Sequence, residues 1–175
     1  NLLDVLQRAG LGVLWVDNQA GCKGVCGRVA NVSTNSAEAA VQQGCTAGEC
    51  QDTVMLANLD ARIAALPQAQ RDKGVVVVLH QMGSHGPAYA KRSAEAQKHF
   101  MPECTSNALQ DCSREQLVNA YDNSIVATDD FLGSAIGWLE AREKQWDSAM
   151  VYVSDHGESL GENNIFLHGM PYAIA

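Results

Sequence analysis

The feature that most constrains this chain is the stretch Val151–Gly161 (VYVSDHGESLG), in which an apolar run leads directly into a cluster of acids and an imidazole. The β-branched start is typical of a buried strand. Within a pleated strand, Asp155 and His156 would point to opposite faces, but Gly157 lets the chain leave the pleat so that both can reach one ion. Carboxylate and imidazole are ligands that Zn²⁺ accepts. The stretch therefore predicts a metal site at a strand end, and the alternative is a solvated Asp-His pair.

Strands and helices alternate along the sequence. Continuous apolar runs predict strands over 13–16, 75–79 and 149–153. Periodic apolar positions predict helices over 1–9, 52–66 and 117–139, whereas 27–44 is expected to be irregular. The last helix follows a capping box at Ser113–Gln116. This order predicts an α/β fold with a mostly parallel sheet flanked by helices, in which ligands gather at the carboxyl ends of strands.

The apolar face of the last predicted helix repeats every three to four residues. We expect it to comprise Leu117, Tyr121, Ile125, Thr128, Leu132, Ile136 and Leu139.

Polar candidates follow each predicted strand. They are Lys23 after the first, His80 and His85 after the second, and Asp155 with His156 after the third. Taken singly, these signals are weak, because a lone loop histidine is more often solvated and His80 fits a buried, hydrogen-bonded histidine better than a ligand. His168 is equally ambiguous by itself. Glu158 is either an outer support of metal ligands or a solvated acid.

Charge and composition exclude several classes of protein. The 175 residues carry a formal net charge of −8, which argues against a nucleic-acid partner, since such binding depends on Lys and Arg. No apolar run approaches the ~20 residues that span a bilayer. Neither end resembles a natural terminus, so we expect a fragment of a longer protein. A hydrolase triad is not expected, because there is no Gly-x-Ser-x-Gly elbow.

The six cysteines fall into three local pairs, each in a Gly-rich or polar loop. Six cysteines allow 15 pairings, but short loops favour the nearest partner, so we expect the disulfides Cys22–Cys26, Cys45–Cys50 and Cys104–Cys112. Zinc thiolate is the competing interpretation, and it is weaker because there is no C-x-x-C knuckle. Disulfides predict an oxidising compartment, either the periplasm or the extracellular space.

Four stretches, in this order, together resemble one known family. They are NLLDVLQRAG at 1–10, LHQMGSHGPAY at 79–89, CSREQLVNAYDN at 112–123 and SDHGESLGEN at 154–163. The chain is similar to the periplasmic catalytic domain of the phosphoethanolamine–lipid A transferases, a family that includes the mobile colistin-resistance enzymes. The resemblance covers nearly the whole chain except 27–44. It implies an alkaline-phosphatase-like fold, also found in sulfatases, within a single periplasmic domain over 1–175.

The resemblance also implies an activity and a set of site residues. The family moves phosphoethanolamine from phosphatidylethanolamine to a lipid A phosphate through a phospho-threonine, which confers polymyxin resistance. It works at the periplasmic face of the bacterial inner membrane, behind an N-terminal transmembrane domain. The motifs assign zinc to Asp155 and His156. They place Lys23, His85, His168 and Glu158 around the substrate, with His85 and His168 as catalytic residues that can hold a second zinc.

The sequence departs from the family pattern in one respect. The family's first zinc ligand, a Glu, and its nucleophilic Thr both precede the helix at 1–9, and none of Thr34, Thr46, Thr53, Thr105 and Thr128 stands in the nucleophile motif. We expect weak or absent zinc binding at the main site and no turnover, because two protein ligands are fewer than the three typical of catalytic zinc. A sulfatase- or phosphatase-like hydrolase and a non-catalytic binding module remain as alternatives.

Overall fold

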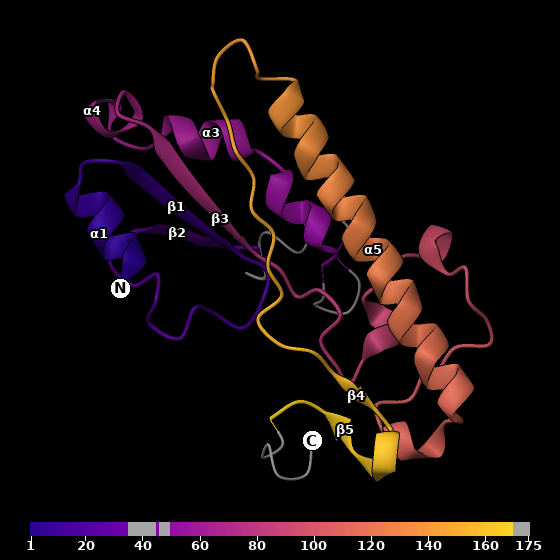
Figure 1. The fold of residues 1–175 in the computed structure, drawn as a ribbon. Helices are drawn as coiled ribbons and strands as arrows, with labels where there is room; N and C mark the ends of the chain where they lie inside the picture. Colours follow the sequence, from indigo (N-terminus) through magenta and orange to yellow (C-terminus); the bar gives the residue numbers. More distant parts are fainter. Residues whose placement is uncertain (35–44, 46–49, 170–175) are drawn as a thin grey trace. The chain divides into compact units, whose positions relative to one another are not determined.

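The computed structural model describes residues 1–34, 45 and 50–169. They form two compact units, Asn1–Met82 and Gly83–Ala175. The first unit contains a parallel sheet, and the second contains one long helix and a short hairpin (Figure 1). Within these described ranges, no helix combines the length and the apolar character needed to cross a membrane.

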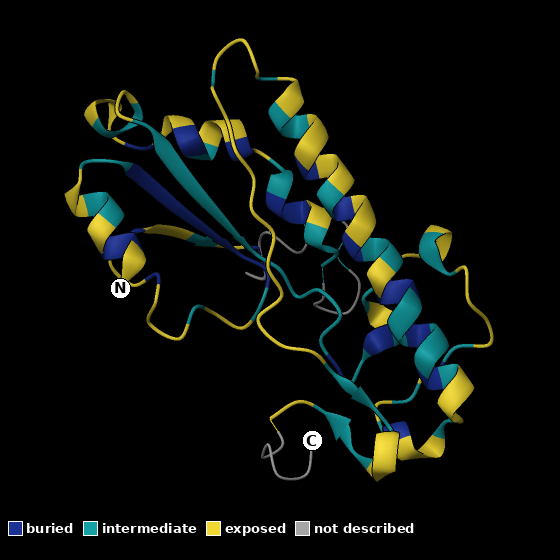
Figure 2. Cartoon of the chain, viewed as in Figure 1, coloured by how far each residue is buried: buried dark blue, intermediate teal, exposed yellow. Residues whose placement is uncertain are grey.

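The sheet of the first unit has three strands in the order β2-β1-β3. Strand β1 (Gly12–Asp17) pairs in parallel with β2 (Ala30–Ser33) and with β3 (Val75–His80). Every residue of the central strand β1 is buried, whereas β3, at one side of the sheet, is half-buried along its length (Figure 2). The predicted α/β fold with a parallel sheet is confirmed.

Alternation along β1 separates two packed faces. On one face, Val13 and Trp15 pack with Leu3 of helix α1 (Leu2–Arg8) and with the buried Cys26 and Val29. Helix α1 begins where Asn1 caps it through the backbone N–H of Asp4. Gly12 belongs to the opposite face, where an added Cβ would lie 3.1 Å from Leu66.

Two predictions about the middle of the first unit are wrong. The single helix predicted over 52–66 is a 3₁₀ turn (Asp52–Leu56) and a separate helix α3 (Leu59–Ala64). The helical path breaks because Ala57 is extended and Asn58 has a left-handed φ of 56°. Strand β2 lies within 27–44, where we expected no regular structure, and only one of its four residues is a large apolar residue. Helix α4 (Gln68–Arg71) was not predicted.

The second unit is organised by helix α5 (Arg114–Glu140), and the predicted capping box is confirmed. Ser113 accepts the N–H of Gln116, and the Gln116 side chain accepts the N–H of Ser113. The predicted apolar face is only partly right, because Ile125 and Ile136 are 45% and 46% exposed. The buried positions are Leu117, Ala120, Asn123, Ser124, Thr128, Phe131 and Ala135.

A small core surrounds the start of α5. Tyr89 and Leu117 are buried there with Cys104, against the hairpin formed by β4 (Ser159–Leu160) and β5 (Phe166–Leu167). Short 3₁₀ turns connect the remaining segments, at Tyr89–Lys91, Glu95–Gln97, Leu109–Asp111 and Glu162–Asn164.

The strand predicted over 149–153 is absent, which is a correction to the sequence-based interpretation. Val151 and Val153 are 89% and 81% exposed. A strand requires a partner for its backbone groups, and this run pairs with no strand among the described residues. The β-branched composition of this run is therefore not sufficient for a strand, because no described strand lies beside it to pair with.

All three expected disulfides are present: Cys22–Cys26, Cys45–Cys50 and Cys104–Cys112. No cysteine is free, so the zinc-thiolate alternative is wrong.

Candidate metal centre

Three histidines from distant parts of the sequence meet in the second unit. One ring nitrogen from each of His85, His156 and His168 lies within 4.8 Å of the others. The rings of His156 and His168 stack with their centroids 4.0 Å apart, and His85 meets the His168 ring edge-on at 4.7 Å. The sequence predicted these three residues as ligands or substrate contacts, and the structure brings them together.

The hydrogen bonds of the three rings fix which nitrogen is free. Nδ1 of His85 lies 2.7 Å from the carbonyl oxygen of Gly86, and Nδ1 of His156 lies 3.0 Å from that of Gly157. Nδ1 of His168 lies 3.1 Å from a carboxylate oxygen of Glu158. Because carbonyl and carboxylate oxygens only accept, each Nδ1 is the donor, and in the neutral form of each ring Nε2 then carries the lone pair. This is the form in which imidazole binds a metal ion.

The carboxylate of Glu158 hydrogen-bonds to His168 and to the loop that carries His85, and so supports the three histidines. Its side chain is 4% exposed. Besides His168, it accepts the N–H of Gly86 at 3.3 Å and the hydroxyl of Tyr89 at 3.2 Å. Burial and the nearby charge of Glu158 raise the pKa of Tyr89 far above its usual value, so the hydroxyl stays a donor. Of the two alternatives left open for Glu158, an outer support of metal ligands or a solvated acid, its burial and these contacts exclude the solvated acid.

Close packing holds the loop that carries His85. An added Cβ at Gly86 would lie 2.7 Å from the hydroxyl oxygen of Tyr89 and closer still to the side chain of Leu167, so a larger residue here would displace these side chains. Arg92 donates from Nε to the carbonyl oxygen of His85 at 2.9 Å. Sequence analysis missed both Tyr89 and Arg92, because neither stands in a pattern that distinguishes it from an ordinary loop residue.

Asp155 does not belong to the three-histidine group. Its side chain is 82% exposed, and one oxygen lies 3.7 Å from Nε2 of His156. Asp155 therefore lies beside the three-histidine group, next to His156, with its side chain largely in solvent.

Lys23 lies in the first unit, on an exposed turn. It has a left-handed φ of 48° and sits inside the loop closed by the Cys22–Cys26 disulfide. His80, expected to be a buried, hydrogen-bonded histidine, is hydrogen-bonded, since its Nδ1 lies 2.6 Å from a carboxylate oxygen of Asp17, but its side chain is 28% exposed and not buried.

The three histidines fit a zinc ion in number and chemistry. Catalytic zinc has three protein ligands, and tetrahedral Zn–N bonds place the ligand nitrogens about 3.3 Å apart. The observed spread of up to 4.8 Å is wider than this, so binding of one ion by all three would require the side chains to move closer together. His85 is half-buried, and the other two are exposed, so the group is accessible.

Comparison with known proteins gives the family. A model of the sulfatase family matches residues 1–175. The chain belongs to the sulfatase family. Within it, the chain is 45% identical over 179 residues to phosphatidylethanolamine transferase Mcr-2 of Escherichia coli, covering 100% of this chain and 32% of that protein. It is 46% identical over 174 residues to phosphoethanolamine transferase EptA of Salmonella typhimurium, covering 99% of this chain and 30% of that protein.

Solved structures of this branch of the sulfatase family show the same fold. The integral membrane protein lipooligosaccharide phosphoethanolamine transferase A of Neisseria meningitidis matches with a TM-score of 0.86 and 43% identity, over 100% of this chain and 31% of that one. The C-terminal periplasmic domain of phosphoethanolamine transferase EptC of Campylobacter jejuni matches with a TM-score of 0.82 and 40% identity. The match covers 100% of this chain and 52% of that one. The sulfatase-like fold and the resemblance to these transferases are confirmed. The chain spans about a third of the length of the curated relatives it matches.

Proposed function

We propose that the complete protein carrying this chain is a phosphoethanolamine transferase. It moves phosphoethanolamine from phosphatidylethanolamine to a lipid A phosphate at the periplasmic face of the bacterial inner membrane. The observation that carries this proposal is a group of three histidines that could hold a metal ion. It lies in a chain that is 43–46% identical, over nearly its whole length, to proteins named phosphoethanolamine or phosphatidylethanolamine transferases. Three disulfides agree with an oxidising compartment.

The cofactor proposed for this site is Zn²⁺. His85, His156 and His168 supply three imidazole nitrogens, and Asp155 can add a carboxylate beside His156. When bound, zinc supplies positive charge that activates a nucleophile and neutralises phosphoryl oxygens. The motif-based assignment of a first ion to Asp155 and His156 and a second to His85 and His168 is an alternative distribution of the same ligands.

The chain's own residues are proposed to bind and orient the anionic substrate. The ammonium group of Lys23 contacts a phosphate oxygen, as a point charge suited to phosphate. In their doubly protonated form, with no metal bound, His85 and His168 donate from Nε2 to phosphoryl oxygens. Glu158 fixes the positions of His168 and of the loop that carries His85, through its hydrogen bonds to His168 and to the N–H of Gly86.

The route proposed for the transfer is covalent. The hydroxyl oxygen of the threonine that the resemblance places ahead of this chain attacks phosphorus, the P–O bond to diacylglycerol breaks, and the threonine proton passes to the departing diacylglycerol oxygen. An oxygen of the lipid A phosphate then attacks the phosphorus of the phospho-threonine, and the P–O bond to threonine breaks, so that the threonine oxygen takes up a proton and the hydroxyl is restored. Transfer adds an amine to an anionic surface, which lowers its attraction for cationic polymyxins.

The test is expression of the complete protein in a strain without its own transferases of this kind, followed by mass spectrometry of lipid A. We expect the added mass of a phosphoethanolamine group, and loss of that addition in His85→Ala. His99→Ala is the matched control, because His99 is an exposed histidine of the same unit outside the site. Unmodified lipid A from cells producing the intact protein would refute the proposal.

Hydrolysis is a second candidate function, favoured by the match to the sulfatase family as a whole. A hydrolase would release product from a simple aryl sulfate or aryl phosphate ester efficiently, without any lipid acceptor. Turnover of such an ester by the complete protein, together with unmodified lipid A, would replace the transferase assignment.

A further inference from the structure

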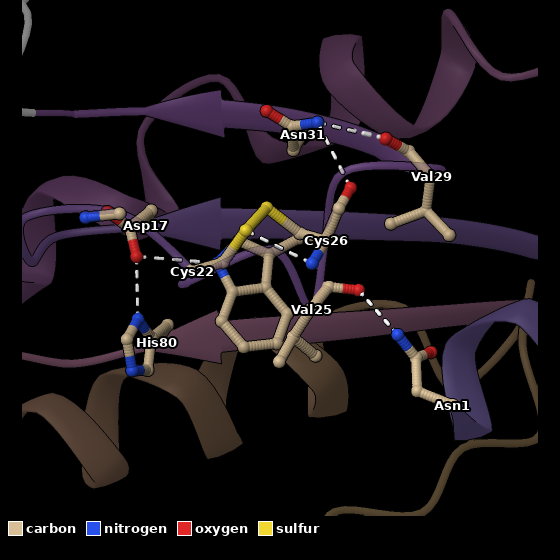
Figure 3. Close-up of a disulfide and its surroundings, with 10 residues drawn as sticks. Asn1, Asp17, Cys22, Val25, Cys26, Val29, Asn31 and His80 are labelled. Carbon is tan, nitrogen blue, oxygen red and sulfur yellow. Dashed lines mark hydrogen bonds and ion pairs between the residues drawn. A yellow bond between two sulfur atoms is a disulfide. The ribbon is translucent and has the colours of Figure 1, made fainter.

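A buried carboxylate at the end of β1 has no role in the proposed site. Asp17 is 4% exposed, and all of its side-chain partners are N–H donors. One oxygen lies 2.6 Å from Nδ1 of His80 and 3.4 Å from Nε1 of Trp15. The other oxygen accepts the backbone N–H of Gly21 at 2.9 Å. Figure 3 shows Asp17 reaching His80 beside the Cys22–Cys26 disulfide.

Strand pairing fixes the position of this carboxylate. Asp17 and His80 are register partners across β1 and β3, and the N–H of Asn18 donates to the carbonyl oxygen of His80 at 3.0 Å. The His80 ring packs against Trp15 with centroids 4.9 Å apart. Because the sheet holds both members of the pair, the oxygen that faces Gly21 is held as well.

The bond from Asp17 restrains the turn that carries Lys23. Gly21 has a φ of 104° and Lys23 a φ of 48°, a left-handed conformation that non-glycine residues seldom adopt without support. Downstream, the turn is tied by the disulfide from Cys22 to the buried Cys26. Upstream, the hydrogen bond from Gly21 to Asp17 ties it to the end of β1.

We propose that Asp17, oriented by His80, is a positioning residue that fixes the turn from Gly21 to Lys23 and so presents the Lys23 ammonium to the substrate phosphate. The inference rests on the proposed function in one respect, because it takes Lys23 as a substrate contact. The hydrogen bond from the Gly21 N–H to Asp17, called the clamp below, lies within the first unit and can be measured without an activity assay.

Two substitutions at position 17 separate the clamp from the charge. Asp17→Ala removes both acceptor oxygens and frees the Gly21 N–H. Asp17→Asn keeps one oxygen for Gly21, and its amide can donate to Nδ1 of His80 in the other imidazole tautomer. The clamp is therefore lost in the first variant and kept in the second.

The experiment uses the complete protein and measures hydrogen exchange at the Gly21 amide, together with transfer kinetics. We expect faster exchange at Gly21 in Asp17→Ala and protection close to wild type in Asp17→Asn. Asp17→Ala and Lys23→Ala should each lower kcat/KM about tenfold or more, because misplacement of a substrate contact is costly. The kcat/KM of the double variant should equal that of Lys23→Ala alone, since Asp17 acts only by positioning Lys23 and has no effect once that side chain is removed.

Asn31→Ala is the control for general loosening of the loop. Asn31 donates to the carbonyl oxygens of Cys26 and Val29, at 3.3 and 3.0 Å, downstream of the turn. It should leave exchange at Gly21 and kcat/KM unchanged. Thermal unfolding of each variant identifies any that fails to fold, and Asp17→Asn then carries the test.

The outcomes distinguish this inference from the proposed function. Unchanged Gly21 exchange in folded Asp17→Ala overturns the positioning role, as do multiplicative effects in the double variant or loss of activity in Asp17→Asn equal to that in Asp17→Ala. If the wild-type protein transfers nothing, the proposed function fails, while Gly21 exchange still decides whether Asp17 clamps the turn.

Discussion

Nδ1 of His168 lies 3.1 Å from Oε1 of Glu158, and the same oxygen accepts the backbone N–H of Gly86 at 3.3 Å. One buried carboxylate therefore connects His168 directly to the residue that follows His85. Such outer partners orient metal-binding imidazoles and raise their basicity. The geometry of the histidine group depends on Glu158 even though Glu158 is not a ligand in it.

Removing this carboxylate should weaken zinc binding. We expect Glu158→Ala to lower zinc affinity by about 10- to 100-fold, and Glu158→Gln by less, because glutamine retains one acceptor oxygen. Competition against a chromophoric chelator measures the affinity. Glu115→Gln, at an exposed position in the first turn of α5, is the control. Equal affinities for Glu158→Ala and wild type would show that the contact is only structural.

Zinc binding should require all three histidines. One imidazole nitrogen from each lies within 4.8 Å of the other two, so His85→Ala, His156→Ala and His168→Ala should each reduce affinity about tenfold or more through loss of a ligand. His99→Ala should not change it. Titration of the chain would contradict this prediction if the three variants bound as tightly as wild type. Failure of Asp155→Asn to change the affinity would support the three-histidine arrangement over the Asp155–His156 pair.

Sequence patterns predicted the elements whose cause is local. The capping box at Ser113 and Gln116 depends on four consecutive residues, and it starts α5 as predicted. The disulfides follow from short spacing, and β1 from a continuous apolar run. The site histidines were weak signals singly, and they were assigned because the stretches of sequence taken together resemble one family.

Elements that depend on distant partners could not be predicted. The run at 149–153 has strand composition, yet no described strand pairs with it. Asn123 is buried on α5 in place of the apolar Ile125, because it hydrogen-bonds a loop more than twenty residues away. The contact between Asp17 and His80 requires the register of two strands 63 residues apart. No period in the sequence reports such pairings.

Asn123→Ala should destabilise the second unit. Asn123 is fully buried, donates to the carbonyl of Phe100 at 2.9 Å, accepts the Phe100 N–H at 2.9 Å and donates to Glu103 at 3.0 Å. Its loss leaves the backbone groups of Phe100 and one oxygen of Glu103 without this partner, and each such group that is buried costs about 1–3 kcal/mol when unpaired. Denaturant unfolding should show a clearly larger loss than Asn119→Ala, whose exposed side chain makes one bond, to the carbonyl of Pro102 at 2.8 Å. Equal losses of stability for the two variants would show that the hydrogen bonds of Asn123 to Phe100 and Glu103 contribute nothing special to the second unit.

The contribution of Asp4 should depend on pH. The Arg28 guanidinium, which donates to Asp4 from Nε at 2.9 Å, holds the pKa of Asp4 well below its usual range. A carboxyl whose pKa is lowered by folding stabilises the fold above its unfolded pKa of about 3.9 and loses that contribution as the pH falls toward its folded pKa. The difference in melting temperature between wild type and Asp4→Asn should therefore be largest at neutral pH and should narrow below about pH 4. Asp72→Asn, which changes an exposed carboxyl hydrogen-bonded to Gln68 at 2.5 Å, should show a smaller difference at neutral pH. A gap for Asp4→Asn that stayed constant from neutral pH to pH 2 would mean that packing, and not the charge of Asp4, holds this end of α1.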